Sequence, residues 1–455
     1  MMIPPLFIDR IQATFPDGEG DAFLGSLTNE PAVSIRLHPS KKNVGFVGSH
    51  SVPWNTEGFY LPQRPEFIFD PAFHAGAYYV QESSSMFIKK ALEKIDLPSH
   101  AVVLDLCAAP GGKSTLLLSH FPSDTLVVAN EVIRTRIPAL KENIQRWGYP
   151  NAVITNADPA DFEVLYETFD VIVVDAPCSG EGMFRKDPDA AKHWSPDALQ
   201  TCELRQKRIL ASAIKAVKPG GYLIYSTCTF NAGENEAQVN ELLSQGFEFI
   251  PILSDSEFPE IERVRSDGRK MGYAFYPHRV NGEGFYLALL RKSAEFTEIM
   301  PTETKMRKPF FSKTIKPDAQ MQQWIQRPDE YVWKERNETI YVLPKNLEKN
   351  IELITSSVHV MYAGVAAGIQ KGGDFLPEHA LALSVIVNNN IPHIEFTEEE
   401  SLKFLKKESI RSHELPKGIY VVRYQGLNLG WVKAVPGRLN NLLPMEFRIR
   451  KNIEW

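Results

Sequence analysis

Two cysteines occupy similar surroundings, each directly after an apolar run that has the length of a buried strand. Cys178 lies in the segment DAPCSG that begins at Asp175, and Cys228 lies in the segment STCT that begins at Ser226. A lone cysteine usually serves as a small buried apolar residue. A thiolate beside a carboxylic acid, in contrast, suits alkylation of a pyrimidine at C5, in which the thiolate adds to C6 and the acid protonates N3.

Metal binding is the other common use of cysteine. The chain has four cysteines, and they show neither C-x₂-C spacing nor a neighbouring pair of histidines. The sequence therefore predicts no metal site. The four cysteines are Cys107, Cys178, Cys202 and Cys228.

A glycine-rich segment, DLCAAPGGKS, runs from Asp105 to Ser114 between a predicted strand and a predicted helix. A Gly-Gly pair lets the backbone approach a ligand closely, and the helix N-terminus that follows favours negative charge. A phosphate loop would need glycine where Cys107 stands, and no G-x-G-x-x-G pattern is present. A plain tight turn remains the alternative.

Acidic residues end the next two predicted strands. Glu131 follows Gly112 by about 20 residues, the spacing at which an acid accepts hydrogen bonds from ribose hydroxyls in nucleotide-binding folds. Asp158 follows the next strand and could accept a hydrogen bond from an adenine amino group. Helix capping for Glu131 and turn formation for Asp158 are the alternatives.

Strand-like and helix-like patterns alternate through the middle of the chain, which predicts an α/β fold with a mostly parallel sheet and helices on both faces. Ligands bind such sheets at the carboxyl ends of the strands, where the polar clusters stand. A long helix is expected to begin at Pro196, capped by Ser195, and to end before Pro219. Strands are predicted at 101–104, 126–129, 152–155, 169–174, 222–225, 247–252, 273–276 and 284–290, and further helices at 83–95, 113–120, 136–147 and 236–243.

These motifs resemble the S-adenosylmethionine-dependent RNA 5-methylcytosine methyltransferases of the Nop2/Sun/Fmu family. The resemblance rests on Asp105–Ser114, on DAPCSGEGM from Asp175, on STCTF from Ser226, on YVQES from Tyr79 and on GFY from Gly284. It implies a Rossmann-like methyltransferase core with S-adenosyl-L-methionine as the cofactor.

The resemblance also implies roles for individual residues. Cys228 matches the nucleophile, Cys178 the cysteine that resolves the covalent adduct, Asp175 the acid that bonds cytosine N3, and Lys113 a lysine that reaches the target base. DNA cytosine methyltransferases carry their nucleophile in a Pro-Cys motif, which would select Cys178 instead. The expected cofactor contacts are Cys107, Ala108, Ala109, Pro110, Gly111, Gly112, Lys113, Glu131, Arg136, Asp158 and Asp175.

The C-terminal part is similar to the tail of the RsmF (YebU) group within this family, which modifies small-subunit ribosomal RNA and ends in a PUA-like module. The similar segments are AGVAAG from Ala363, FLPEHALA from Phe375 and GLNLGWVK from Gly426. We therefore expect an N-terminal α+β RNA-binding domain at 1–75, a catalytic domain at 76–294, a linker at 295–316, and mixed α/β RNA-binding modules at 313–385 and 386–455, the last PUA-like.

The expected partner is RNA, most simply 16S ribosomal RNA or the 30S subunit. Two basic clusters are read as phosphate-contact surfaces. Transfer RNA as the substrate, an inactive RNA-binding assembly factor and a small-molecule methyltransferase are the alternatives. The first cluster comprises Arg263, Arg265, Arg269, Lys270, His278 and Arg279, and the second comprises Lys433, Arg438, Arg448, Arg450 and Lys451.

Composition is consistent with this interpretation. The chain has 455 residues, 43% of them hydrophobic and 23% charged, which excludes a wholly disordered protein. Its net charge of −6 excludes a protein that is basic throughout. Because we find neither a signal peptide nor a long apolar run, we expect a cytoplasmic protein with reduced cysteines that does not bind membrane. We also expect it to be a monomer that does not bind DNA.

Overall fold

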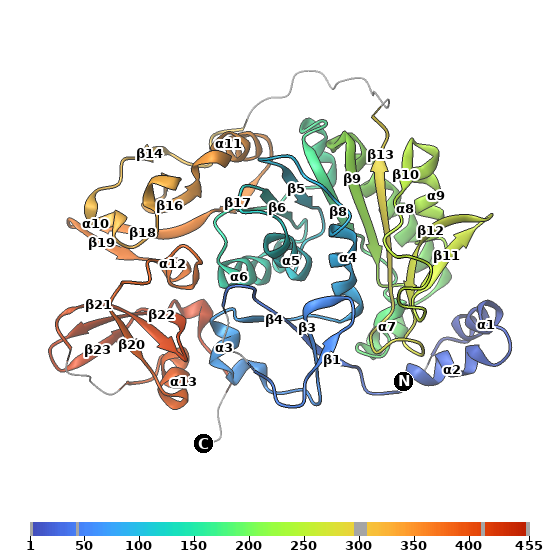
Figure 1. Ribbon diagram of the computed structural model, residues 1–455, viewed down its shortest axis with the longest axis horizontal. Helices are drawn as coiled ribbons and strands as arrows, with labels where there is room; N and C mark the ends of the chain where they lie inside the picture. Colours follow the sequence, from blue (N-terminus) through green and yellow to red (C-terminus); the bar gives the residue numbers. More distant parts are fainter. Residues whose placement is uncertain (1–2, 42–44, 295–306, 411–414, 452–455) are drawn as a thin grey trace.

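The computed structural model describes residues 3–41, 45–294, 307–410 and 415–451, and a ten-stranded sheet forms its centre (Figure 1). The strand order is β11-β12-β13-β9-β8-β5-β6-β7-β17, and β10 pairs with β13. Five neighbouring strands are parallel, namely β5 (Val102–Asp105), β6 (Leu126–Asn130), β7 (Ala152–Thr155), β8 (Phe169–Asp175) and β9 (Val217–Thr227). The predicted α/β fold is thus confirmed.

Antiparallel strands extend the sheet on both sides. Beyond β9 lie β13 (Phe285–Lys292), β12 (Arg269–Phe275), β11 (Glu262–Ser266) and β10 (Phe247–Phe249). Beyond β7 lies β17 (Val360–Ala363), which comes from a segment assigned in the sequence to a C-terminal module. The central sheet therefore takes in a strand from far along the chain.

The parallel strands are almost wholly apolar because both faces of the sheet are covered by helices. One face packs against α4 (Ile88–Leu92), α5 (Gly112–His120) and α6 (Ile137–Trp147). The other face packs against α8 (Pro196–Ala216), α9 (Glu236–Ser244) and α11 (Glu348–Ser357). Because the five strands run parallel, their carboxyl ends lie together along one edge of the sheet.

Helix α8 begins as predicted, because the Ser195 side chain accepts a hydrogen bond from the Ala198 backbone N–H and Pro196 fills the first turn. The helix also ends before Pro219, as predicted, but the residues that were expected to close it belong to a strand. The helix stops at Ala216, and Pro219, Gly220 and Gly221 lie inside β9. Strand β9 therefore begins before the predicted strand at 222–225, because the Pro-Gly-Gly pattern is typical of a turn and did not indicate a strand.

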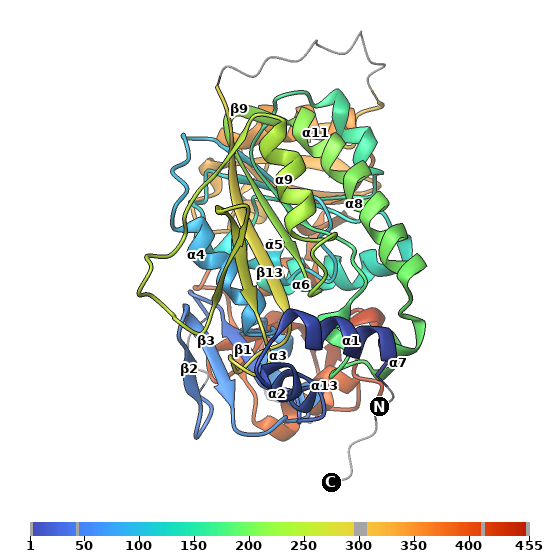
Figure 2. The same ribbon diagram turned by 90° about the vertical axis from the view of Figure 1, so that its right-hand side faces the viewer.

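The N-terminal region forms three α-helices and a small antiparallel sheet with the order β2-β3-β1-β4. Figure 2 shows α1 and α2 beside α7 (Pro188–His193), and Phe7 of α1 packs against Trp194 with ring centroids 5.9 Å apart. The elements are α1 (Pro5–Thr14), α2 (Glu19–Ser26), β1 (Val33–Leu37), β2 (His50–Val52), β3 (Asn55–Leu61), α3 (Pro71–His74) and β4 (Tyr78–Val80).

Two further sheets form the C-terminal region. One has the order β14-β15-β16-β18-β19 and the other the order β20-β21-β22-β23. Of the predicted linker, 295–306 lies outside the described residues, and β14 occupies part of the rest. The elements are β14 (Lys313–Ile315), α10 (Ala319–Gln322), β15 (Tyr331–Arg336), β16 (Thr339–Pro344), β18 (Val365–Lys371), β19 (Asp374–Pro377), α12 (His379–Leu383), β20 (His393–Glu395), α13 (Glu398–Lys406), β21 (Gly418–Tyr424), β22 (Leu427–Val435) and β23 (Arg438–Asn441).

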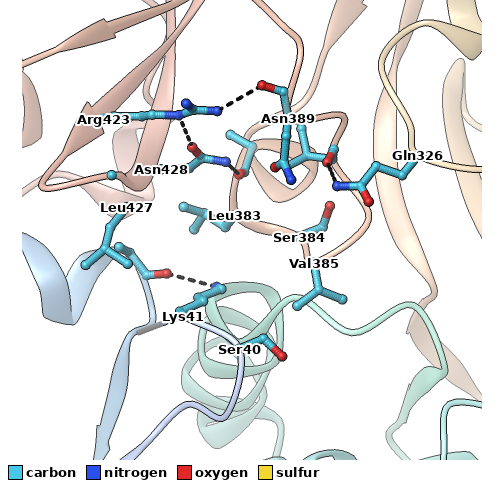
Figure 3. Close-up of a pocket in the computed structure, with 14 residues that line it drawn as sticks. Ser40, Lys41, Gln326, Leu383, Ser384, Val385, Asn389, Arg423, Leu427 and Asn428 are labelled. Atoms are coloured by element: carbon cyan, nitrogen blue, oxygen red, sulfur yellow. Dashed lines mark hydrogen bonds between the residues drawn. The ribbon is translucent and has the colours of Figure 1, made fainter. Parts of the chain in front are cut away.

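A cavity of about 540 Å³ lies where the N-terminal sheet, α6 and the C-terminal region meet, with Lys41 on one side and Arg423 on the other (Figure 3). The Lys41 ammonium donates to the backbone carbonyls of Ala75 and Arg146, near the C-terminal ends of α3 and α6. Cations are favourable at helix C-termini. Lys41 therefore ties two helices of different regions together, and burial lowers its pKa to about 7.

In the part of the chain that the structure describes, no helix combines the length and apolar character needed to cross a membrane.

Candidate active site

The glycine-rich loop lies between β5 and α5, at the carboxyl edge of the sheet. Gly111 has a φ of 113°, in the left-handed region that favours glycine, and α5 begins at the next residue. From the N-terminal sheet, the buried Arg36 donates to the Gly112 carbonyl at 3.2 Å and to Thr115 Oγ1 at 2.7 Å. Arg36 thus fixes the first turn of α5, which carries Lys113.

Asn130 joins three neighbouring strand ends. Its side-chain amide donates to the carbonyls of Leu106 and Ala157, and its Oδ1 accepts hydrogen bonds from Thr155 Oγ1 at 2.8 Å and from the Ala157 N–H at 3.1 Å. A buried amide with its bonds satisfied holds its neighbours in one arrangement. The loops after β5, β6 and β7 are therefore held in a fixed relation.

Lys113 and Asp175 form an ion pair at the centre of this edge, with 2.7 Å between Nζ and Oδ2. Ser226 Oγ donates to Asp175 Oδ1 at 2.8 Å, which links the ends of β8 and β9. Burial alone would lower the pKa of Lys113, but the Asp175 carboxylate outweighs burial and raises that pKa above its ordinary value. Lys113 is accordingly a cation at neutral pH.

The two predicted catalytic cysteines meet across the same edge. The Sγ atoms of Cys178 and Cys228 are 3.2 Å apart, and both side chains are half-buried. The hydrogen bond to Cys228, together with burial, raises the pKa of Cys178 well above its ordinary value. Cys178 is therefore protonated at neutral pH, and its S–H can donate to the Cys228 sulfur.

A buried carboxylate that sequence reasoning missed holds the two cysteine loops together. Glu234 accepts hydrogen bonds from the Ser179 N–H at 2.8 Å, from Ser179 Oγ at 2.6 Å and from Gln206 Nε2 at 3.1 Å. Its position six residues after Cys228 was visible, but nothing in the sequence showed that the carboxylate turns inward. Glu234 fixes the segment after Cys178 from the loop that follows Cys228.

A second buried carboxylate, Glu181, connects the site to the N-terminal helices. It accepts from Arg10 of α1 at 2.5 Å, from Trp194 Nε1 at 2.7 Å and from the Phe230 N–H at 3.1 Å. The first helix of the chain therefore contacts a loop next to the cysteines.

The predicted cofactor acids differ in their surroundings. Glu131 is buried, and its Oε1 accepts from the Ile133 N–H at 2.8 Å, whereas its Oε2 lies 3.2 Å from Arg136 without a hydrogen bond. Arg136 also donates to the Ala109 carbonyl of the glycine-rich loop at 2.6 Å. A carboxylate oxygen without a hydrogen-bond donor beside this loop fits the hydroxyls of a ribose.

Asp158 has partners for both of its oxygens. Oδ1 accepts from the Ala160 N–H at 3.1 Å, and Oδ2 lies 3.1 Å from Arg208. The side chain caps a short 3₁₀ helix, Pro159–Val164, through a capping box with Asp161. The contact between Asp158 and an adenine amino group stays a prediction, and the turn-forming alternative has a visible structural basis.

Asp105 gives the site a pH-dependent contribution to stability. Burial raises its pKa to about 7, against an ordinary value of 3.8, although Ser114 Oγ donates to Oδ2 at 2.6 Å. Between about pH 4 and pH 7 the folded chain keeps a proton on Asp105 that the unfolded chain releases. The contribution of Asp105 to the free energy of unfolding therefore falls as the pH rises through this range.

We expect Asp105→Asn to remove this fall. Relative to the wild type, the free energy of unfolding of the variant should rise by about 2–4 kcal/mol between pH 4.5 and pH 8, since each pKa unit corresponds to about 1.4 kcal/mol. Urea unfolding of both proteins at several pH values measures the difference, and the other titrating groups cancel. A difference that does not change with pH would contradict the assignment.

Several members of the first basic cluster are engaged within the protein, whereas Arg265 and Arg269 are exposed, so the phosphate-contact role of this cluster stays a prediction. Arg279 pairs with Glu19 and Glu262, and His278 lies 2.8 Å from Glu19. Arg263 donates to four backbone carbonyls between 254 and 261. These pairings cross from one element to another, which charge counting along the sequence cannot show.

Three family models match the chain. The model described as 16S rRNA methyltransferase RsmB/F matches residues 93–291, the N-terminal domain of 16S rRNA methyltransferase RsmF matches 3–83, and the methyltransferase RsmF PUA domain matches 391–449. They cover the central sheet, the N-terminal region and the second C-terminal sheet.

Individual proteins agree with these models. The chain is 31% identical to ribosomal RNA small subunit methyltransferase F of Aliivibrio fischeri (strain MJ11), over 98% of both chains, and 33% identical to the protein of the same name of Enterobacter sp. (strain 638), over 98% of this chain and 96% of that one. A methyltransferase homolog protein from Pyrococcus horikoshii is 26% identical, with a TM-score of 0.51, over 64% of this chain and 100% of that one. The Rossmann-like methyltransferase core is thus confirmed.

Proposed function

The chain belongs to the ribosomal RNA small subunit methyltransferase F family, and on that premise we propose that it methylates C5 of a cytosine in 16S ribosomal RNA. The observation that carries the proposal is the pair of thiols, Cys178 and Cys228, 3.2 Å apart beside the Lys113–Asp175 ion pair. Covalent activation of a pyrimidine needs a nucleophile and a proton donor together, and this edge of the sheet supplies both.

S-adenosyl-L-methionine, when bound, supplies the electrophilic methyl group. The residues present fit it, because Glu131 keeps a carboxylate oxygen without a hydrogen bond beside the glycine-rich loop. We propose that Glu131 accepts from the ribose hydroxyls, with Arg136 and Asp158 as neighbouring contacts. The backbone of the loop from Cys107 through Ala108, Ala109, Pro110 and Gly111 to Gly112 would line the rest of the site.

In the first step the Cys228 thiolate attacks C6 of the cytosine. The new Sγ–C6 bond uses the sulfur electron pair, the electrons of the C5=C6 bond shift toward N3, and N3 takes a proton from the Lys113–Asp175 pair. The result is an electron-rich C5. Because Ser226 and Lys113 both contact Asp175, the carboxyl group is held in one orientation while it serves N3.

In the last step C5 would carry the methyl group supplied by the cofactor. Cys178, having released its own S–H proton to water, takes the proton from C5; the electrons of that C5–H bond restore the C5=C6 bond, and the Sγ–C6 bond breaks to release the Cys228 thiolate. N3 returns its proton to the Lys113–Asp175 pair. We propose Cys178 as the group that serves this elimination. The hydrogen bond from Cys178 to Cys228 raises the Cys178 pKa in the free enzyme, and it is lost once the Cys228 sulfur is bound to C6. Cys178 then becomes easier to deprotonate.

Tritium release tests the reaction. We expect 16S RNA that carries [5-³H]cytosine to lose tritium to water in the presence of enzyme and S-adenosylmethionine, because only substitution at C5 displaces that atom. Transfer RNA labelled in the same way is the matched control. Methyl incorporation without tritium release would place the methyl group elsewhere, and release from transfer RNA alone would select the alternative substrate.

The cofactor assignment predicts that Glu131→Ala weakens S-adenosylmethionine binding. The variant loses an acceptor for hydroxyl groups, and hydrogen bonds to charged groups contribute about 1.5–3 kcal/mol, a factor of about 10–100 in Kd. Calorimetry measures the change. Glu163→Ala, at an acid that pairs with Lys215, is the control and should bind normally. Equal affinity in Glu131→Ala and the wild type would contradict the assignment.

The flanking regions suit an RNA enzyme. We propose that 1–75, 313–385 and 386–455 contact RNA, and the PUA match at 391–449 supports this role for the last. We also propose that the enzyme acts as a monomer on small-subunit RNA in the cytoplasm, without binding DNA or membrane.

A further inference from the structure

Two cavities that share residues form one groove at the edge of the central sheet where β17 pairs with β7. Their volumes are about 730 Å³ and about 590 Å³, and Arg336, His359 and Val360 line both. The groove is lined by residues of α6, of β17 and of the segment near the end of the described chain. We name it the α6–β17 groove and define it by Arg134, Lys141, Arg336, His359, Met361 and Arg450.

The groove lies beside the carboxyl end of β7, on the side of the sheet where the parallel strands end and the active site lies. Asn156 makes the connection, since its side-chain amide donates to the Glu131 carbonyl at 2.7 Å and its backbone N–H donates to the His359 carbonyl at 2.9 Å. Arg134 Nε in turn donates to Asn156 Oδ1 at 3.3 Å. Asn156 therefore connects two residues that line the groove, Arg134 and His359, to the backbone of the proposed cofactor acid Glu131.

The groove is positively charged although the whole chain carries a net charge of −6. In the described ranges, Arg336 lies 3.7 Å from the centroid of the Phe310 ring, and Lys141 lies 5.6 Å from that of Tyr362 and also interacts electrostatically with Glu378. Arg307 and Lys308 add two exposed cations to the second cavity. Of the two acids that line the groove, Glu142 pairs with Arg146, which leaves Glu446.

One exposed apolar side chain, Met361, lines the groove, and three others are sequence neighbours of residues that line it. Val132 and Ile133, which precede Arg134, are 50% and 49% exposed, and Met361 and Met445 are 41% and 58% exposed. Cations interleaved with apolar contact surface are typical of sites for single-stranded nucleic acid, in which phosphates meet the cations and base faces meet the apolar groups.

We propose that the α6–β17 groove binds an unpaired segment of the substrate RNA that flanks the target cytosine. The inference rests on the proposed function, because it takes the substrate of the neighbouring site to be RNA. The charge of the groove favours a polyanion over a protein partner. Bound there, the RNA would continue from the active-site edge onto α6 and the C-terminal residues.

Charge reversal at two positions far apart in the sequence, Lys141→Glu with Arg450→Glu, tests the proposal. The control is Lys94→Glu with Lys207→Glu, which makes the same change in net charge at exposed positions outside the groove and outside the regions proposed to contact RNA. Each protein is assayed for binding to unmethylated 16S RNA over a range of salt concentrations, for its RNA KM and kcat, and for S-adenosylmethionine affinity.

We expect the groove variant to bind RNA at least about tenfold more weakly and to raise KM with kcat unchanged. Its plot of log K against log salt should be flatter by about 1.4, since each phosphate contact on a single strand contributes about 0.7. S-adenosylmethionine affinity should match the wild type, and the control should match it in every measurement. Unchanged RNA affinity and salt dependence would overturn the proposal.

Binding and activity separate this proposal from the proposed function. A wild type that binds RNA with the predicted salt dependence but releases no tritium would reject the function and leave the groove supported as an RNA site. A variant that binds naked RNA normally and fails only on assembled 30S subunits would overturn the groove proposal and indicate contact with a ribosomal protein.

Discussion

Cys178→Ala should accumulate a covalent protein–RNA complex, whereas Cys228→Ser should form none and lose methyl transfer altogether. Cys228 lies where its thiolate can attack C6, and a serine hydroxyl in its place is a far weaker nucleophile at neutral pH. Without Cys178, attack and methyl transfer proceed, but the elimination that releases the product stalls. The complex should appear as a shifted band on denaturing gels and should depend on S-adenosylmethionine.

The 3.2 Å between the two sulfur atoms makes the control essential, because either thiol could occupy the position of the other after a small shift. Cys202→Ser, on α8, is the matched control and should behave as the wild type. A band only in the Cys228 variant would assign the nucleophile to the Pro-Cys motif. The absence of a band in both variants, with wild-type activity intact, would contradict the covalent mechanism.

The sequence predicts the part of the structure that depends on local patterns. Four of the five parallel strands were expected within one residue at either end, because a strand covered on both faces must be apolar throughout, whereas only 222–225 of β9 was expected. Parallel strands also end on the same side of a sheet. The sequence therefore places Lys113, Asp175, Cys178 and Cys228 together at the carboxyl ends of the strands. The site could therefore be assembled from strand ends alone.

Contacts between distant segments could not be predicted in this way. Arg36 lies in the N-terminal sheet and donates to Thr115, and Glu234 turns inward to hold Ser179. Strand β17 joins the central sheet from residue 360 onward, so the α6–β17 groove has no signature in any one stretch of sequence. The pairing of Arg279 with Glu19 likewise neutralises one cation of a cluster that is basic when its residues are counted along the chain.

Lys113→Met should reduce kcat by about 10²–10⁴-fold, the range for loss of a positioned acid–base group, while S-adenosylmethionine affinity changes less than about twofold. The Lys113 ammonium lies 2.7 Å from the Asp175 carboxylate and is the proton donor nearest to it. Removing it leaves Asp175 with Ser226 as its remaining side-chain partner in the described structure. Steady-state kinetics and calorimetry on the same preparation measure both quantities.

The double variant with Asp175→Asn decides whether the two residues act as one unit. If Lys113 and Asp175 together hold and return the N3 proton, removal of either one disables the pair, and the double variant should be about as slow as the slower single variant. Losses that multiply would mean that the two residues act separately. Parallel losses of turnover and cofactor affinity in Lys113→Met would instead assign Lys113 to the fold of the loop, where Arg36 already fixes the first turn of α5 through the Gly112 carbonyl.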